Sequence, residues 1–176
     1  MDKKFLRKMV RDRLSSIPME EKGKRSAIMS VELGERLSES SARVVALFSP
    51  LSDEPHIWDF VESLSGRVQV ALPRVEGDVM RFYRYVRGNL EKGSFGIMEP
   101  DEAELVTPGD IDVMVVPGVA FTEAGARMGR GRGYYDKYMS LPGFWALKIG
   151  VCFREQLVDC LPVEAHDIVM DAVVVG

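Results

Sequence analysis

A strand, a loop and a helix are predicted in succession within residues 112–136, which read DVMVVPGVAFTEAGARMGRGRGYYD. The run from Val113 to Val116 is continuously apolar, which is typical of a strand covered on both faces of a sheet. Pro117 closes this strand, and a glycine-rich loop then leads into a helix expected from Tyr134 onward. Ligands of α/β proteins bind beyond the carboxyl ends of such strands. The stretch therefore predicts an α/β fold with a binding loop behind a buried strand.

Similar short runs rich in β-branched residues recur along the chain. We expect strands at residues 43–48, 67–72, 80–86, 112–116, 147–153 and 172–175. Apolar residues at three- and four-residue steps predict helices at 5–17, from about Glu20 through Leu37, at 57–64 and at 134–140. The mixed polar and aromatic run 81–86 is typical of an edge strand or a local hairpin. We predict one domain over residues 1–176, of the α/β class, with an open, mostly parallel sheet and helices on both faces.

The composition excludes several classes of protein. The chain has 176 residues, 46% of them hydrophobic and 28% charged, which is the range of ordinary globular domains. Its apolar runs are too short to span a bilayer, and its formal charge of −4 argues against a general nucleic-acid coat. Two cysteines, Cys152 and Cys160, exclude a disulfide scaffold. With no export signal visible in residues 1–7, we expect a cytoplasmic location.

The glycine-rich loop has the chemistry of a clamp for a polyphosphate. Gly129, Gly131 and Gly133 alternate with Arg130 and Arg132, so that bare backbone and guanidinium groups would meet the same anion. The spacing matches neither a Walker loop nor the dinucleotide fingerprint. A flexible turn with solvated arginines is the alternative, and the strand before the loop and the helix after it favour the clamp.

Two aspartates are candidate magnesium ligands. Asp136 follows the loop, where a carboxylate would meet either a bound triphosphate's Mg²⁺ or simply the helix dipole. Asp167 precedes the last predicted strand and is otherwise interpreted as a solvated turn residue. A basic cluster in residues 1–13 is interpreted either as a solvated stripe or as a further phosphate contact, because Lys3 and Arg7 share a helix face.

Residues 117–136 resemble the corresponding segment of the 5-formyltetrahydrofolate cyclo-ligase family, also called methenyltetrahydrofolate synthetases. Supporting segments follow in the same order over essentially the whole chain: 3–7 (KKFLR), 52–54 (SDE), 72–74 (LPR), 96–100 (GIMEP), 110–112 (DID) and 149–151 (IGV), then Asp167 and Asp171.

The resemblance implies a reaction and its co-substrates. It implies an ATP- and Mg²⁺-dependent ring closure of 5-formyltetrahydrofolate to 5,10-methenyltetrahydrofolate, with release of ADP and phosphate. The formyl oxygen would attack the γ-phosphate, and N10 of the folate would then attack the same carbon. The implied fold is Rossmann-like and three-layered, of the NagB/RpiA/CoA-transferase type. The implied partner is a small-molecule folate, with no nucleic acid and no membrane, and the protein would be a monomer or weak dimer.

The resemblance also implies roles for individual residues. Catalytic roles fall on Arg130, Arg132 and Tyr135. ATP-binding roles fall on Lys3, Lys4, Arg7, Arg127, Gly129, Arg130, Gly131, Arg132, Gly133, Tyr134 and Tyr135. Folate-binding roles fall on Glu54, Phe95, Arg130, Gly131, Arg132, Gly133 and Tyr134. Asp136 and Asp167 would hold Mg²⁺.

The sequence departs from the family pattern after Glu54. The family commonly has an apolar residue, a variable position and Thr there, whereas this chain has Pro55, His56 and Ile57. Proline fixes φ and removes a backbone donor, so Pro55 bears on the geometry with which the loop presents Glu54 and on the folate preference. The alternatives are a nucleotide- or folate-binding module without catalysis and a family member that acts on another substrate. An RNA-binding protein is disfavoured by the acidity of the chain.

Overall fold

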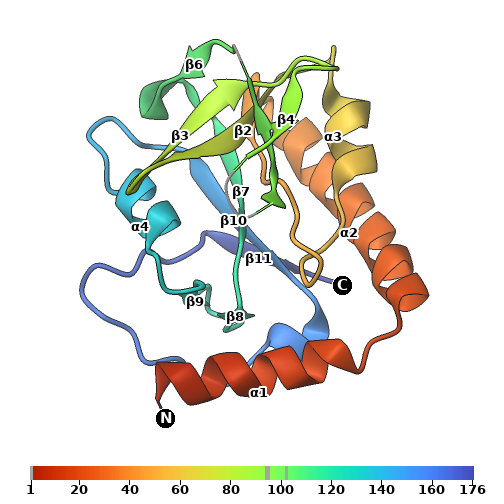
Figure 1. Ribbon diagram of the computed structural model, residues 1–176, viewed down its shortest axis with the longest axis vertical. Helices are drawn as coiled ribbons and strands as arrows, with labels where there is room; N and C mark the ends of the chain where they lie inside the picture. The colour runs from red at the N-terminus through yellow and green to blue at the C-terminus, as the bar shows by residue number, and fades with distance from the viewer. Residues whose placement is uncertain (1, 94–95, 102) are drawn as a thin grey trace.

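The apolar runs form a seven-stranded sheet with the order β11-β10-β7-β1-β2-β3-β6 (Figure 1). The computed structural model describes residues 2–93, 96–101 and 103–176. The strands of the sheet are β1 (Val44–Ala46), β2 (Gln69–Glu76), β3 (Val79–Arg84), β6 (Leu105–Val106), β7 (Val113–Pro117), β10 (Leu147–Cys152) and β11 (Ala172–Val175). Neighbours from β11 to β2 are parallel, whereas β3 is antiparallel to β2 and β6 to β3. The predicted open, mostly parallel sheet is confirmed.

Four α-helices among the described residues follow the predicted periodicity. They are α1 (Lys3–Ser15), α2 (Met19–Ser40), α3 (Trp58–Leu64) and α4 (Tyr134–Met139), and two 3₁₀ turns, η2 (Pro108–Asp110) and η3 (Arg154–Gln156), accompany them. Residues four apart share a helix face, and the buried residues of the two long helices recur at this step. The buried sets are Leu6, Val10 and Leu14 in α1, and Met29, Leu33 and Leu37 in α2.

The central strand β7 contributes to both sides of the core. Val113 and Val115 belong to the cluster formed with α1, α2 and α3, whereas Met114 and Val116 belong to the cluster formed with α4. Successive side chains of a strand point to opposite faces, which explains why an unbroken apolar run is needed here. On the α4 side, the Tyr138 ring lies 4.8 Å from the ring of Phe82 in β3. Helices therefore cover both faces of the sheet, as predicted.

The edges of the sheet differ in detail from the sequence prediction. The predicted hairpin is confirmed, because β3 folds back on β2. The last strand, β11, is as continuously apolar as β7, a pattern typical of coverage on both faces, yet Val173 and Val175 are only half-buried because β11 lies at the sheet edge. Two further antiparallel pairs are not predicted: β4 (Leu90–Lys92) with β5 (Met98–Pro100), and β8 (Ala120–Phe121) with β9 (Arg127–Met128). These strands are too short to show a period.

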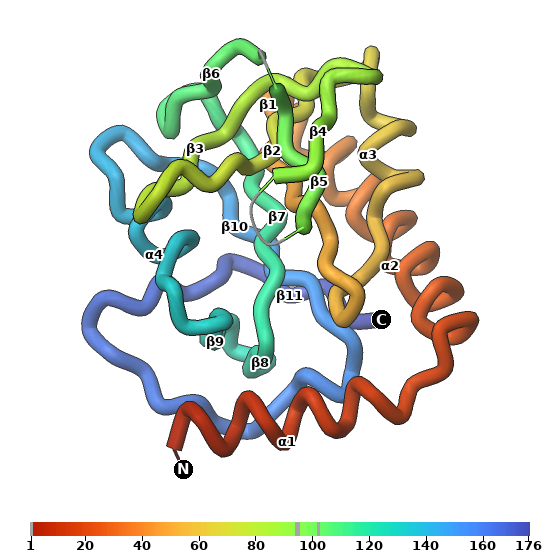
Figure 2. Tube along the Cα trace, viewed as in Figure 1, coloured from red at the N-terminus to blue at the C-terminus, as the bar shows by residue number. Residues whose placement is uncertain are grey.

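Helix α1 lies across the end of the sheet, next to the β8–β9 hairpin (Figures 1 and 2). It contacts β8 and η3, and η3 follows the carboxyl end of β10. This placement brings the basic first turns of the chain to the edge where the parallel strands end. Among the described residues, no helix combines the length and the apolar character that a membrane crossing requires.

Candidate active site

A cavity of about 320 Å³ lies at the carboxyl ends of β1 and β7. It is lined by the residues after β1, by β2 and β5, and by the loop that follows β7. Apolar side chains supply much of the wall, notably Phe48, Leu51, Val75, Met80 and Ile97. Charged side chains also line it, namely Glu54, Glu99, Arg127, Arg130, Arg132 and Asp136. An apolar slot with a few fixed polar groups is the usual form of a site for a small organic ligand.

Glu54 is a buried carboxylate that lines this cavity and is 7% exposed. A tight turn holds it: the Glu54 N–H donates to the carbonyl of Leu51, and the Leu51 N–H donates back to Oε2 of Glu54 at 2.9 Å. Burial raises the pKa of the Glu54 carboxyl, and the nearby Arg130 charge works against that rise. Pro55 does not displace this residue, because the turn that carries Glu54 uses the backbone of Leu51.

Arg130 reaches from the loop into the cavity and pairs with the two adjacent carboxylates of Asp53 and Glu54. Its Nε and Nη2 donate to Oε1 of Glu54 at 3.1 and 3.0 Å, and Nη2 also donates to Oδ1 of Asp53 at 2.5 Å. Burial lowers the pKa of Arg130, but the hydrogen bond to Asp53 and the two carboxylate charges outweigh it and leave the pKa raised. Arg130, which is predicted to contact both ATP and the folate, and Glu54, which is predicted to contact the folate, therefore belong to one ion-pair network.

Arg127 and Asp136 form a second, more deeply buried ion pair in the cavity wall. Nη2 of Arg127 donates to Oδ2 of Asp136 at 2.8 Å, and Nη1 donates to the Pro117 carbonyl at 3.1 Å. The guanidinium also lies 5.5 Å from the centre of the Tyr135 ring. Its Nε–H is buried and donates to no acceptor among the described residues. The Arg127 side chain is therefore buried and joins the end of β7 to the start of α4, and it does not extend into solvent.

The first turn of α1 meets the segment before β11. Lys3 Nζ lies 2.8 Å from Oε1 of Glu164 and 3.3 Å from Oδ2 of Asp167. Burial opposes ionisation of Asp167, but the hydrogen bond from the Glu164 N–H and the Lys3 ammonium together hold the pKa of Asp167 below its usual value. Oδ1 of Asp136 accepts a 3.3 Å hydrogen bond from the Ile168 N–H. The two predicted metal ligands therefore lie in neighbouring segments.

The other two predicted basic residues of α1 differ in their surroundings. Arg7 Nε donates to the Gly129 carbonyl at 3.0 Å, which ties α1 to the glycine-rich loop. Lys4 is exposed and forms no ion pair with the part of the chain that the structure describes. The structure thus brings Lys3 and Arg7 to the site and leaves Lys4 at its periphery.

The loop backbone adopts conformations that favour glycine. Gly131 has φ +110° and Gly133 has φ +69°, values that side chains rarely tolerate. Gly129, Arg132, Gly133, Tyr134 and Tyr135 all line the cavity. The Tyr134 hydroxyl donates to the Gly77 carbonyl at 3.2 Å, a hydrogen bond that joins the start of α4 to the turn between β2 and β3. Burial, together with the Glu54 charge, raises the pKa of the Tyr135 phenol, so this hydroxyl stays protonated at neutral pH.

One cavity residue, Glu99 of β5, is not among the site residues predicted from the sequence. It is 7% exposed, lines the cavity and accepts a 3.1 Å hydrogen bond from the Val75 N–H at Oε1. Its carboxylate packs on Gly93, where an added Cβ would lie 1.9 Å from Oε2. Glu99 belongs to the segment 96–100 that supports the family resemblance, and this was the signal that could have drawn attention to it. Phe95, a predicted folate contact, lies outside the described residues.

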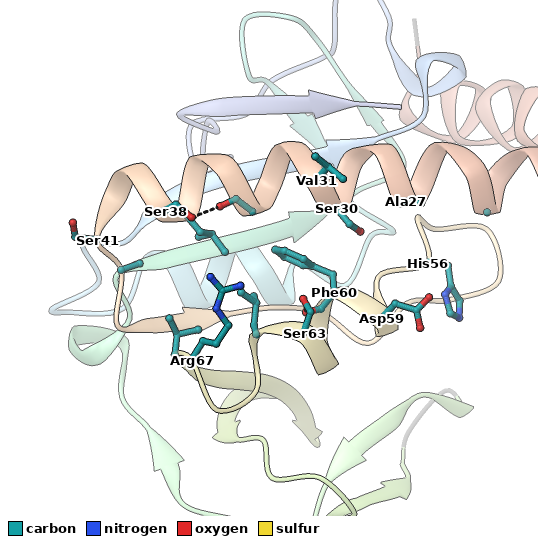
Figure 3. Close-up of a pocket in the computed structure, with 16 residues that line it drawn as sticks. Ala27, Ser30, Val31, Ser38, Ser41, His56, Asp59, Phe60, Ser63 and Arg67 are labelled. Carbon is teal, nitrogen blue, oxygen red and sulfur yellow. Dashed lines mark hydrogen bonds between the residues drawn. The ribbon is translucent and has the colours of Figure 1, made fainter.

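A second concave region, of about 710 Å³, lies between α2 and α3 (Figure 3). Small side chains of α2, such as Ser30 and Ser38, face Phe60, Ser63 and Arg67 across it. Three of its serine hydroxyls are engaged locally, because Ser30 donates to the Ser26 carbonyl, Ser38 to the Gly34 carbonyl and Ser63 to the Phe60 carbonyl. We call this region the α2–α3 groove. It is larger than the cavity but contains no converging ion pairs among the residues that line it.

Fold and cavity together define an α/β protein with a cavity beyond the carboxyl ends of its parallel strands, where arginines and carboxylates converge. Comparison with known proteins specifies the class. The model of the 5-formyltetrahydrofolate cyclo-ligase family matches residues 1–176, and this chain belongs to that family.

Individual relatives agree with this assignment. The 5-formyltetrahydrofolate cyclo-ligase of Mycolicibacterium smegmatis is 33% identical over 141 residues, which is 74% of this chain and 72% of that protein. The mouse protein of the same name is 25% identical over 97% of this chain and 92% of its own. The solved 5,10-methenyltetrahydrofolate synthetase of Aquifex aeolicus superposes with a TM-score of 0.88 at 35% identity, covering 99% of this chain and 90% of that chain.

Proposed function

We propose that this chain is an ATP-dependent ligase that converts 5-formyltetrahydrofolate into 5,10-methenyltetrahydrofolate in the cavity beneath the loop 127–136. The match of the family model to residues 1–176 is the observation that carries the activity. The location is supported by the cavity itself, where a buried carboxylate, apolar walls and several arginines converge.

Glu54 and the apolar wall would bind the pteridine end of the folate. A carboxylate offers two acceptors in one plane, which suits the paired N–H donors of an aminopyrimidine. The apolar side chains around it, among them Phe48 and Met80, would pack on the ring. The substrate would thus enter with its donor-rich edge at Glu54 and its formyl group toward the loop.

The loop and α1 would bind the nucleotide phosphates. Arg7 and Lys3 lie against the loop and the segment before β11, and Arg130 and Arg132 line the cavity. The backbone at Gly131 and Gly133 leaves room for close approach of oxygen atoms. Catalysis of phosphoryl transfer depends mainly on positioning and charge neutralisation, which is what these groups supply.

The reaction then proceeds in two displacements. The formyl oxygen attacks the γ-phosphorus and ADP departs, which leaves a phosphorylated, activated formyl carbon. N10 attacks that carbon and releases its proton to water, after which the carbon–oxygen bond breaks and phosphate leaves. Arg130 and Arg132 would neutralise charge on the transferred group, while the protonated Tyr135 hydroxyl is a hydrogen-bond donor rather than a base.

The carboxylates of Asp136 and Asp167 fit a magnesium ion that arrives with ATP. Mg²⁺ prefers oxygen ligands and needs only one or two protein carboxylates beside phosphate and water. Three metal-binding side chains do not cluster anywhere in the described residues, so phosphate and water would have to complete the coordination. When bound, the ion would offset phosphate charge. Arg127 and Lys3, which now pair with the two aspartates, would then be available to the phosphates.

The test of this proposal is turnover. Purified protein with ATP, Mg²⁺ and 5-formyltetrahydrofolate is expected to develop the absorbance of the methenyl product and to release one ADP per product. Nucleotide and folate binding without ADP release over hours would instead indicate a binding module. Product formed only from a different formylated compound would indicate another substrate.

Matched arginine variants test the location. Arg130→Ala removes a guanidinium from the cavity and is expected to lower kcat/KM by about 10²- to 10³-fold, the usual cost of losing one preorganised charge-stabilising group. Arg67→Ala removes an exposed arginine from the α2–α3 groove and is expected to leave kcat/KM unchanged within about twofold. Equal rates from folded samples of both variants would contradict the assignment of the site to the cavity.

A further inference from the structure

Two adjacent carboxylates share the guanidinium of Arg130, and they face different parts of the site. Glu54 is buried and lines the apolar cavity. Asp53 keeps about a third of its side chain exposed and lies beside the cationic side of the site. Asp53 and Arg130 line a small separate hollow together with Arg7 and Arg11 of α1. Asp53 is therefore an acid among three arginines at the end where phosphates are proposed to bind.

The acceptor sites of Glu54 are unevenly occupied. Oε2 accepts one hydrogen bond, from the Leu51 N–H, whereas Oε1 accepts two, from Nε and Nη2 of Arg130. A carboxylate oxygen offers about two lone-pair sites. A ligand that donates two parallel hydrogen bonds needs one free site on each oxygen. Such a ligand can therefore bind Glu54 only if Arg130 gives up at least one of its hydrogen bonds to Oε1.

When an arginine in a partly buried site loses its carboxylate partner, its charge is left unpaired and poorly solvated. This is energetically unfavourable unless a second anion contacts the guanidinium. Asp53 already contacts Nη2 of Arg130 at 2.5 Å and does not line the apolar cavity. We propose that Asp53 is a positioning residue, which retains Arg130 at the phosphate side of the site when the folate substrate takes Glu54. This inference rests on the proposed function and assigns a role to a side chain that does not line the cavity.

By retaining Arg130, Asp53 couples folate binding at Glu54 to the position of a cation at the phosphate end of the site. Binding of the pteridine at Glu54 turns Arg130 from a partner of Glu54 into a cation held beside Arg7 and Arg11. The guanidinium is then oriented toward the transferred phosphoryl group at the time when negative charge develops on it. Asp53 therefore acts on kcat, through Arg130, more than on the KM for either substrate.

The experiment is a double-mutant cycle on Asp53 and Arg130, measured as steady-state kcat and as KM for each substrate. Asp53→Asn keeps the shape of the side chain and removes its charge. We expect kcat to fall about tenfold, with both KM values changed by less than threefold. In the Arg130→Ala background, we expect the same substitution to change kcat by less than it does in the wild-type background, because the group that Asp53 positions is gone.

Two controls separate this role from structural damage. Asp59→Asn removes an exposed carboxylate six residues along the chain and is expected to leave kcat within twofold. The thermal midpoint of Asp53→Asn is expected to stay within a few degrees of the wild type, and Asp53→Ala serves if the asparagine variant fails to fold.

Two results would overturn the inference. One is a kcat for the folded Asp53 variant that falls less than fivefold, and the other is an equal fractional loss in both backgrounds of the cycle. Absence of turnover in the wild type would refute the proposed function instead, so the two failures are distinguishable.

Discussion

The cavity under the loop and the α2–α3 groove are both concave, yet they differ in what converges on them. The groove measures about 710 Å³ and the cavity about 320 Å³. The groove is lined by small side chains whose hydroxyls bond to their own helices. The cavity is lined by segments from distant parts of the chain, and ion pairs join Arg127 to Asp136 and Arg130 to Glu54.

Charge convergence, more than volume, is therefore the reason for which we propose the cavity as the site. Ordering two ion pairs around an apolar slot costs desolvation energy, and proteins retain such groups where function requires them. Helix packing leaves grooves without any such cost. Substitutions in the cavity should therefore change chemistry or stability strongly, and matched substitutions in the groove should change little.

The largest effect on stability is expected for Arg127→Ala. Arg127 is almost fully buried, and its loss would leave the Asp136 carboxylate, which is 15% exposed, without its cation. Breaking such a pair from one side costs about 3 kcal/mol or more of unfolding free energy. Urea denaturation would measure the loss. A double variant, Arg127→Ala with Asp136→Ala, should recover part of it, and additive losses in the cycle would contradict the coupling.

The next largest effect is expected on the magnesium requirement. Asp136→Asn removes a charged oxygen ligand and should lower kcat by about 100-fold while raising the Mg²⁺ concentration needed for half-maximal rate. Asp59→Asn in the groove is the matched control and should leave both quantities unchanged. A normal Mg²⁺ dependence in Asp136→Asn would remove this residue from the proposed metal site.

Much of the fold was predictable from sequence because its elements carry strong local patterns. The apolar run Val113–Val116 and the four-residue spacing of Leu6, Val10 and Leu14 each identify their element without tertiary information. The strands Leu90–Lys92 and Ala120–Phe121 were not predictable, because strands of two or three residues contain no measurable alternation. Their pairing is set by the chain that surrounds them.

The candidate site was predictable as a set of residues, but its pairings were not. The loop glycines and arginines are adjacent in the sequence, so their presence at one cavity could be predicted without knowledge of the fold. The contact of Lys3 with Asp167 joins residues 164 apart, and that of Arg130 with Glu54 joins residues 76 apart. Such partners depend on the topology of the sheet, as does the position of Glu99.

A smaller effect is expected on the acid stability of the protein through the contact of Asp167 with Lys3. The folded-state pKa of Asp167 is lowered, so its ionised form stabilises the fold above the unfolded pKa, and this contribution is lost as pH falls through the folded value. The difference in unfolding free energy between wild type and Asp167→Asn should be constant from pH 7 to about 5 and shrink below about pH 4. A difference that grows on acidification would contradict the depressed pKa.

The smallest effect is expected for Val31→Gln in the α2–α3 groove. Val31 is 63% exposed on α2, so the substitution removes little buried apolar surface, and glutamine is at least as good a helix former as valine. The free energy of unfolding should change by less than about 0.5 kcal/mol, and kcat/KM should stay within twofold. Parallel denaturation and turnover assays would measure both. A tenfold loss of activity in a stable Val31→Gln protein would mean that the groove contributes to the site, because no ion pair or buried contact would account for such a loss. An unchanged protein would show that this position of the larger concave surface can be altered without consequence for activity or stability.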